Sequence, residues 1–165
     1  MKRILCFALL VVFLCGCQGK QPTELIGKGL SFGVDLTYYN EEFKCDGTVS
    51  QDGVMILCVR EPEDLNGLTF TYRGKDVTAE YMGLTYTPDC GKMPVGCAAS
   101  LLYHLFGQVG TSEELPQQNE GQLYLEGKAD GYWYRFFFSP VGLPLSFEVP
   151  ACGLEGIFRD VTLIS

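Results

Sequence analysis

An alternation of apolar and polar side chains with a period of two runs through most of the chain and sets what it can fold into. The alternation is clearest in Leu30–Tyr38, where every second residue is apolar and the residues between are Ser, Gly, Asp and Thr. This period places the apolar side chains on one face of a β-strand. Glycine is abundant, with 20 residues, and aromatic residues reach 13%. Both features favour β structure.

The same pattern, interrupted by turn residues, predicts about nine strands. The turns are short, so strands that follow one another in the sequence should also be antiparallel neighbours in a meander. After residues 30–38, the expected strands cover residues 43–49, 54–60, 68–72, 76–86, 122–127, 132–138, 145–149 and 157–163.

One segment, residues 95–106, has a helical period. Its apolar residues recur at the spacing of one helix face, namely Ala98, Leu101, Leu102, Leu105 and Phe106. Gly107 should end this helix, and residues 108–120 should form a polar, acidic connector. A sheet of this size has one wide apolar face and only this helix to cover it. We therefore expect a mainly β (α+β) fold, an open and curved antiparallel half-barrel with one helix packed in its concave face.

The first residues have the layout of an export signal. Lys2 and Arg3 precede an apolar run, Ile4–Leu14, which is too short to span a bilayer comfortably. The residues Leu14-Cys15-Gly16-Cys17 resemble the bacterial lipobox. This resemblance implies that a diacylglyceryl group is attached to Cys17 and that the chain is cleaved just before it. We expect a signal peptide over 1–16, a lipidated linker over 17–29 and one domain over 30–165.

Charge narrows the choice of partners. The precursor has a net charge of −8, and residues 1–16 contain two basic residues and no acidic one, so the chain from Cys17 onward is near −10. Such a surface repels nucleic acid and anionic headgroups. We therefore expect no nucleic-acid partner. The membrane contact should come from acyl chains, such as palmitate, on Cys17, with the domain on the extracytoplasmic side.

Three stretches resemble a family of small lipoproteins from Gram-positive bacteria that have a LolA/LolB-like fold. They are Pro62-Glu-Asp-Leu-Asn-Gly-Leu-Thr-Phe70, Tyr81-Met-Gly-Leu84 and Gly142-Leu-Pro-Leu-Ser-Phe147. The order of lipobox, five strands, helix and four strands also matches that family. The resemblance implies an open half-barrel whose cavity, in the better-known relatives, accepts acyl chains of lipoproteins or glycolipids. It supplies no set of catalytic residues.

Residues suited to catalysis or metal binding are scarce. His104 is the only histidine, which rules out a site built from several histidines. Cys97, Ser100 and His104 share one helix face, but side chains along one helix point the same way and do not meet as nucleophile and base. The cysteine spacing does not suit zinc, and the chain has no phosphate-binding glycine loop. We expect no enzyme activity, no metal and no cofactor.

Five cysteines remain after Cys17, so at most two disulfides can form among Cys45, Cys58, Cys90, Cys97 and Cys152. If Ser50–Gly53 form the hairpin loop, Cys45 lies opposite Cys58 and a disulfide can join them. A three-residue loop with a bulge at Gly53 would break that pairing. A disulfide from Cys90 to Cys97 or Cys152 is a further candidate.

The segment Tyr132–Phe138 is apolar on both faces. One face contains Tyr132, Tyr134 and Phe136, and the other has Trp133 and Phe137 on either side of Arg135. The second face is either buried under the connector 108–120 or lines a cavity or a partner-binding patch.

We expect a non-catalytic binding or carrier domain for an apolar ligand such as an acyl chain or the lipid of a lipoprotein. The expected ligand-binding residues are Phe32, Leu36, Tyr132, Tyr134 and Phe136. The alternative is a cell-envelope interaction module whose cavity is filled by its own side chains.

Overall fold

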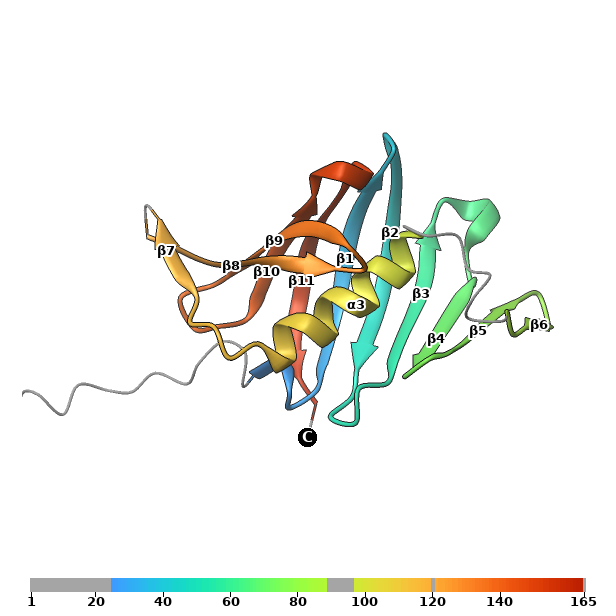
Figure 1. Ribbon diagram of the computed structural model, residues 1–165. Coiled ribbons are helices and arrows are strands. Elements are labelled where there is room, and N and C mark those ends of the chain that lie inside the picture. The colour runs from blue at the N-terminus through green and yellow to red at the C-terminus, as the bar shows by residue number, and fades with distance from the viewer. Residues whose placement is uncertain (1–24, 89–96, 120, 165) are drawn as a thin grey trace, which may run out of the picture.

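A computed structural model describes residues 25–88, 97–119 and 121–164. These residues form one antiparallel sheet of eleven strands, in the order β6-β5-β4-β3-β2-β1-β11-β10-β9-β8-β7. The α-helix α3 (Ala98–Thr111) lies across the sheet, and Leu25 and Ile26 form the end of a further short helical segment. Figure 1 shows the sheet curving around α3, which occupies the concave side. The expected fold class, a mainly β open antiparallel sheet with one helix, is confirmed.

The strands follow the chain as a meander on either side of the helix. Their bounds are β1 Leu30–Tyr38, β2 Glu41–Val49, β3 Met55–Glu61, β4 Thr69–Arg73, β5 Asp76–Tyr81, β6 Leu84–Tyr86, β7 Gln117–Asn119, β8 Gln122–Ala129, β9 Tyr132–Phe138, β10 Pro144–Val149 and β11 Leu154–Leu163. Two short 3₁₀ turns, η1 (Glu63–Leu65) and η3 (Pro150–Cys152), join neighbouring strands.

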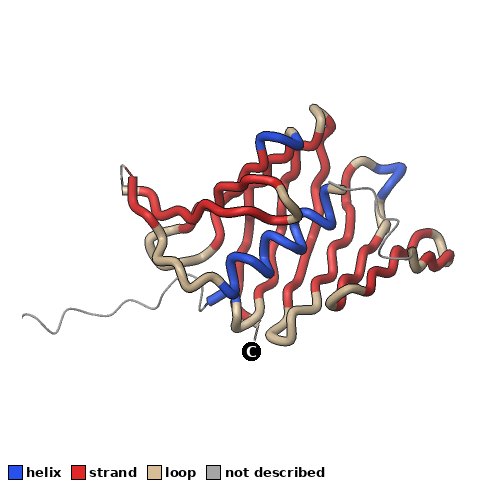
Figure 2. Tube along the Cα trace, viewed as in Figure 1, coloured by secondary structure: helices blue, strands red, loops and turns tan. Residues whose placement is uncertain are grey.

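The core lies between the concave face and α3, which runs obliquely across the strands (Figure 2). Phe106 on the helix stacks on Phe32 of β1, with 5.1 Å between ring centroids, and lies 5.7 Å from Phe158 and 6.0 Å from Phe136. Aromatic pairs at such separations attract one another beyond the burial of their area. The middle of the concave face is therefore filled by side chains.

Two glycines in the strands make room for these aromatic rings. A Cβ atom on Gly47 would lie 2.5 Å from Cε2 of Phe32, and one on Gly156 would collide with the ring of Phe147. A side chain on either strand at these positions would push a core ring out of place. The glycines thus allow rings from neighbouring strands to lie flat over the sheet.

The helix differs from its expected bounds. Residues 95 and 96 lie outside the described residues, and α3 runs from Ala98 through Gly107 to Thr111. Gly107 was expected to end the helix, and that prediction is wrong. Buried contacts hold the last turn in place, because a Cβ on Gly110 would lie only 3.2 Å from Ile26 and Val109 is fully buried.

The number of strands was also underestimated. The expected strand 76–86 is two strands, β5 and β6, because Met82 and Gly83 take positive φ angles of 51° and 78° and turn the chain back. In addition, the short polar strand β7 pairs with β8 inside the region expected to be a connector.

The register between β2 and β3 separates the two cysteines that one of the two possible hairpin loops would have placed opposite each other. Val49 pairs with Met55, so Cys45 lies opposite Val59, and Cys58 lies opposite Asp46. The loop is the three-residue alternative: the Ser50 amide donates to the Val54 carbonyl, and Gly53 has a φ of 78°. Cys45 and Cys58 then point to opposite faces of the sheet, and both are free thiols. Of the two hairpin loops that the sequence left open, the structure has the one that does not bring Cys45 opposite Cys58.

The two faces of β9 have different environments. Tyr134 and Phe136 are buried in the core, whereas Trp133 is 63% exposed on the convex face. Arg135 on that face forms ion pairs with Glu126 at 2.9 Å and with Glu148 at 3.1 Å. The second face thus lies on the convex side, where Arg135 and Phe137 line one hollow and Trp133 and Arg135 line another.

The expected signal peptide and Cys17 lie outside the described residues, as does most of the linker 17–29. Leu25 and Ile26 are described, and both are buried, with Ile26 in the core cluster beside α3. The folded part of the chain therefore begins at least as early as Leu25.

Candidate ligand-binding groove

Two hollows remain on the concave face, near opposite ends of α3. The first, here called the helix-start groove, has a volume of about 340 Å³. It lies between β1–β4, the residues after β3 and the start of the helix. Its lining residues are Leu36, Tyr38, Phe43, Cys45, Leu57, Val59, Leu65, Leu68, Phe70, Cys97, Ala98 and Ala99.

The groove is apolar because of how the strands alternate. Inward positions of β1, β2 and β3 contribute Leu36, Cys45 and Val59, all buried. Charged residues of the same strands, such as Asp35 and Lys44, point to the convex face and form ion pairs there. The helix begins with two alanines, Ala98 and Ala99, and their short side chains leave the space above the strands open. No lining residue of the groove has a formal charge.

Burial favours the neutral form of three ionisable groups in or beside the groove, namely Cys45, Tyr38 and Tyr72. Burial raises the pKa of the Cys45 thiol from 9.0 to about 12. Burial also raises the pKa of Tyr38, which lines the groove, and of Tyr72 on β4. At neutral pH the groove therefore presents uncharged surface, which suits hydrocarbon better than a polar ligand.

Of the five residues expected to bind a ligand, Leu36 lines this groove. Phe32 and Phe136 are fully packed beneath Phe106 in the core, and Tyr134 is also buried. Tyr132 is half-buried at the start of β9 and lines neither hollow. The structure thus buries three of the five expected ligand-binding residues, Phe32, Tyr134 and Phe136, in the core.

Sequence reasoning missed most of the groove. Leu57 and Val59 follow the inward alternation of β3, so their direction was readable from the sequence. The contributions of Leu65, Leu68 and Phe70 were not, because they depend on the turn η1 after β3. Ala98 lines the groove because of where the first turn of α3 lies over the sheet, and the sequence does not give that position.

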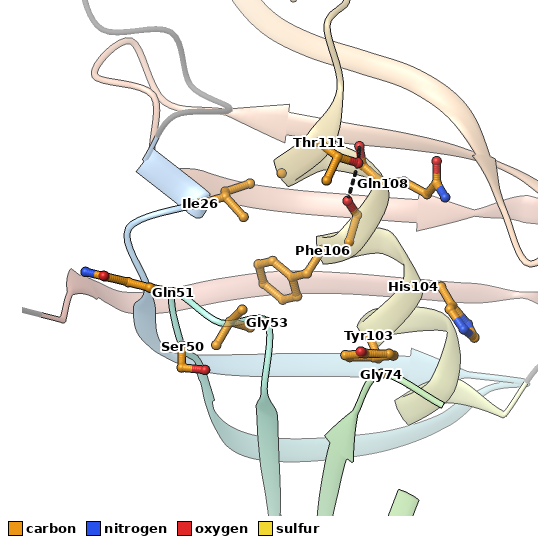
Figure 3. Close-up of a pocket in the computed structure, with 14 residues that line it drawn as sticks. Ile26, Ser50, Gln51, Gly53, Gly74, Tyr103, His104, Phe106, Gln108 and Thr111 are labelled. Atoms are coloured by element: carbon orange, nitrogen blue, oxygen red, sulfur yellow. Dashed lines mark hydrogen bonds between the residues drawn. The ribbon is translucent and has the colours of Figure 1, made fainter. Parts of the chain in front are cut away.

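The second hollow, here called the helix-end pocket, has a volume of about 450 Å³. Figure 3 shows it between the last two turns of α3 and the β2–β3 hairpin, with the side chains of Ile26 and Phe106 facing the space. Its rim is polar, with Ser50 and Gln51 on the hairpin and Gln108 on the helix.

The helix face that combines a thiol, a hydroxyl and an imidazole is at least half-covered at each of these three side chains. Ser100 is buried, while Cys97 and His104 are half-buried. Nδ1 of His104 is buried without a hydrogen-bond partner among the described residues. Within those same residues no group of three or more His, Cys, Asp or Glu side chains could hold a metal ion.

No helix in the described part of the chain is long and apolar enough to cross a membrane.

Comparison with known proteins finds similarity in structure but not in sequence. No protein-family model matches the chain, and neither does any curated protein sequence. Among solved structures, this chain is similar to an uncharacterized conserved protein from Thermus thermophilus. The TM-score is 0.53 and the identity is 11%, over 87% of this chain and 84% of that one. This similarity concerns the fold alone.

Two further structures are similar at lower scores. A LolA superfamily protein, NE2245 from Nitrosomonas europaea, has a TM-score of 0.43 and 11% identity, over 91% of this chain and 95% of that one. The lipoprotein LppX from Mycobacterium tuberculosis has a TM-score of 0.42 and 9% identity, over 84% of this chain and 91% of that one.

Proposed function

We propose that this chain is a membrane-anchored extracytoplasmic lipoprotein whose domain binds an apolar ligand, such as an acyl chain, in the helix-start groove. The observation that carries the proposal is the groove itself, which is open, uncharged and lined by apolar side chains from four strands and the helix. An acyl chain is the simplest ligand with matching chemistry, because it offers no group that needs a hydrogen bond.

The size of the groove fits partial enclosure of one chain. Its volume of about 340 Å³ lies at the lower end of the range of roughly 300–1,000 Å³ found for small-molecule pockets. Each buried methylene contributes about 0.8 kcal/mol, so eight would contribute roughly 6 kcal/mol before the cost of association is subtracted. We therefore expect weak, reversible binding, which suits a carrier better than permanent storage.

The anchor is proposed from the lipobox-like residues that end at Cys17. Cys17 and Leu25 are eight positions apart, which an extended chain spans in at most about 28 Å. The groove would then work within reach of the membrane surface. A Cys17→Ala variant should leave the membrane fraction, and a variant that stays bound would refute this part of the proposal.

Ala98 offers a direct test of the groove. An Ala98→Phe side chain would occupy the groove above Leu57 and Val59. We expect a fluorescent fatty acid to bind the wild-type domain saturably and the Ala98→Phe variant much more weakly, with unchanged circular dichroism. Thr78→Phe, on the neighbouring strand β5 and outside the groove lining, is the control and should bind as the wild type does. Equal binding by all three proteins would refute the assignment.

The alternative, an interaction module without a bound ligand, has one observation in its favour. The β5–β6 hairpin forms an edge of the sheet and exposes Met82 by 83%, Leu84 by 75% and Tyr86 by 65%. An apolar sheet edge is suited to pairing with another chain. If Leu84→Lys abolished association with a partner while fatty-acid binding was absent in the wild type, this alternative would replace the first proposal.

A further inference from the structure

The helix-start groove has acidic residues at its edge, although no residue that lines it has a formal charge. Glu41 pairs with Tyr38, a lining residue, in the register of β1 and β2. It lies two positions before Phe43, another lining residue, so both side chains point to the concave face. Glu41 is exposed, and it therefore lies where the groove opens to solvent.

Two further acidic residues border the groove at η1. Glu63 and Asp64 form this turn together with Leu65, which lines the groove, and both acidic residues are exposed. Figure 1 shows η1 and the turn between β1 and β2 at the same end of the sheet. Glu41, Glu63 and Asp64 are here called the acidic rim. No ion pair joins any of them to a described basic side chain.

The described basic side chains leave the acidic rim uncompensated. Lys44, Arg60 and Arg159, on β2, β3 and β11, are each paired at 2.7–2.9 Å with a carboxylate on the convex face. The other five described basic residues lie before β1, at the β4–β5 turn or on β8 and β9, namely Lys28, Arg73, Lys75, Lys128 and Arg135. A positive charge on a bound ligand would therefore meet three exposed carboxylates at the rim, with no described cation paired to them.

We propose that the helix-start groove selects an acyl or alkyl chain whose polar end is cationic, such as a chain that bears a primary amine. The chain lies among the apolar lining residues, and the ammonium group lies at the acidic rim. This inference rests on the proposed function, because it assumes that the groove binds such a chain. A fatty acid still binds through its chain, but repulsion between its carboxylate and the rim lowers its affinity.

The start of α3 acts in the opposite direction and limits the size of the effect. Cys97 and Ala98, at the start of the helix, line the groove. The first amides of a helix have a partial positive charge, about half an elementary charge, which favours an anion by up to about fivefold. The rim opposes this with three full charges, and each exposed ion pair contributes up to about fivefold. We therefore expect an amine to bind roughly tenfold more tightly than a carboxylate with the same chain.

The test uses three diazirine-labelled ligands that share a decyl chain and end in an amine, a hydroxyl or a carboxylate. The full chain is held in a non-ionic detergent, and labelling is measured on the groove peptides that contain Val59, Phe70 and Ala98. We expect the amine to reach half-saturation at about a tenth of the carboxylate concentration, with the alcohol between them. In about 1 M salt the difference should shrink to about twofold, because exposed charges are screened.

Neutralising the acidic rim should remove the preference. The triple variant Glu41→Gln, Glu63→Gln and Asp64→Asn keeps side chains of similar size and shape and leaves the apolar lining unchanged. We expect its amine and carboxylate concentrations at half-saturation to differ by about twofold or less, since the attraction to the ammonium group is lost. Labelling by the alcohol should stay as in the wild type, which shows that the groove is intact.

A matched control separates the rim from the overall negative charge of the domain. Asp76→Asn, Glu113→Gln and Glu114→Gln remove three exposed acidic residues at the β4–β5 turn and after the end of α3. The net charge changes by the same amount as in the rim variant, but the roughly tenfold preference should remain. Ala98→Phe should weaken labelling of the groove by all three ligands, because the larger side chain occupies the groove.

The other outcomes overturn the proposal in distinguishable ways. Equal labelling by the three ligands, or tighter labelling by the carboxylate, would exclude selection of a cationic end while the groove assignment stands. Equal loss of the preference in both triple variants would mean that the amine responds to overall charge and not to the rim. If none of the three ligands labels the groove saturably, the groove binds no such chain, and the proposed function falls together with this inference.

Discussion

Phe106 is the side chain whose removal should cost the domain most. It is 3% exposed and packs against the rings of Phe32, Phe136 and Phe158. Replacing a buried phenylalanine by alanine costs about 3–5 kcal/mol, because apolar burial is lost and a cavity remains. That is a large part of the roughly 5–15 kcal/mol by which a domain is stable. Phe106→Ala should therefore leave a domain that is folded but only marginally stable.

Urea unfolding followed by far-ultraviolet circular dichroism measures this loss. With a slope of about 2 kcal/mol per molar urea, a loss of about 4 kcal/mol lowers the midpoint by about 2 M. Tyr86→Ala is the matched control, since Tyr86 is an exposed aromatic residue and its loss should change stability by no more than about 0.5 kcal/mol. If both variants moved the midpoint equally, α3 would not be held on the sheet by the aromatic cluster.

Three further predictions concern the strands of the core. Gly47→Ala should lower the free energy of unfolding by about 1–3 kcal/mol through overpacking, because its Cβ would lie 2.5 Å from the ring of Phe32. Gly33→Ala is the control and should lower it less, because no atom lies nearer than 3.5 Å to a Cβ at that position. Equal losses in urea unfolding would contradict this account. Since the pKa of Cys45 rises from 9.0 to about 12 on folding, the unfolded chain loses this proton first, so stability should fall as pH rises above 9, by at most about 1.4 kcal/mol per pH unit. Cys45→Ala should flatten that part of the unfolding profile, and an unchanged slope would refute the assignment. Non-reducing mass spectrometry of the oxidised domain should find no link between Cys45 and Cys58, and finding one would show that the register is wrong.

The strands that the sequence predicted best are those that are bounded by residues typical of tight turns. The expected strand 132–138 matches β9, because Asp130 and Gly131 take the positive φ angles of a tight turn just before it, 53° and 84°. The turn at Met82 and Gly83 was missed, since methionine is not a residue that usually adopts a positive φ.

Tertiary contacts explain the remaining differences in the fold. Gly107 has the chemistry of a helix end, but the burial of Val109 and the close approach of Gly110 to Ile26 keep the last turn helical. The strand β7 consists of Gln117, Gln118 and Asn119, and it forms through pairing with β8 without any apolar pattern of its own.

The candidate site was only partly readable for a similar reason. The period-two alternation predicted correctly that the side chains of Phe32 and Leu36 both point to the concave face. It did not predict where the helix crosses that face. The sequence therefore could not show that Phe32 lies under the helix in the core whereas Leu36 lies beside the helix in the groove. The position of the crossing decides which apolar residues form core and which form groove.

Photo-crosslinking with a diazirine-labelled fatty acid tests the central claim most directly, because it reports both binding and place. We predict saturable labelling of peptides that contain Val59, Phe70 and Ala98, competed by unlabelled fatty acid and lost in Ala98→Phe. Labelling that does not saturate, or that concentrates on the exposed residues Met82 and Leu84, would contradict a ligand in the helix-start groove.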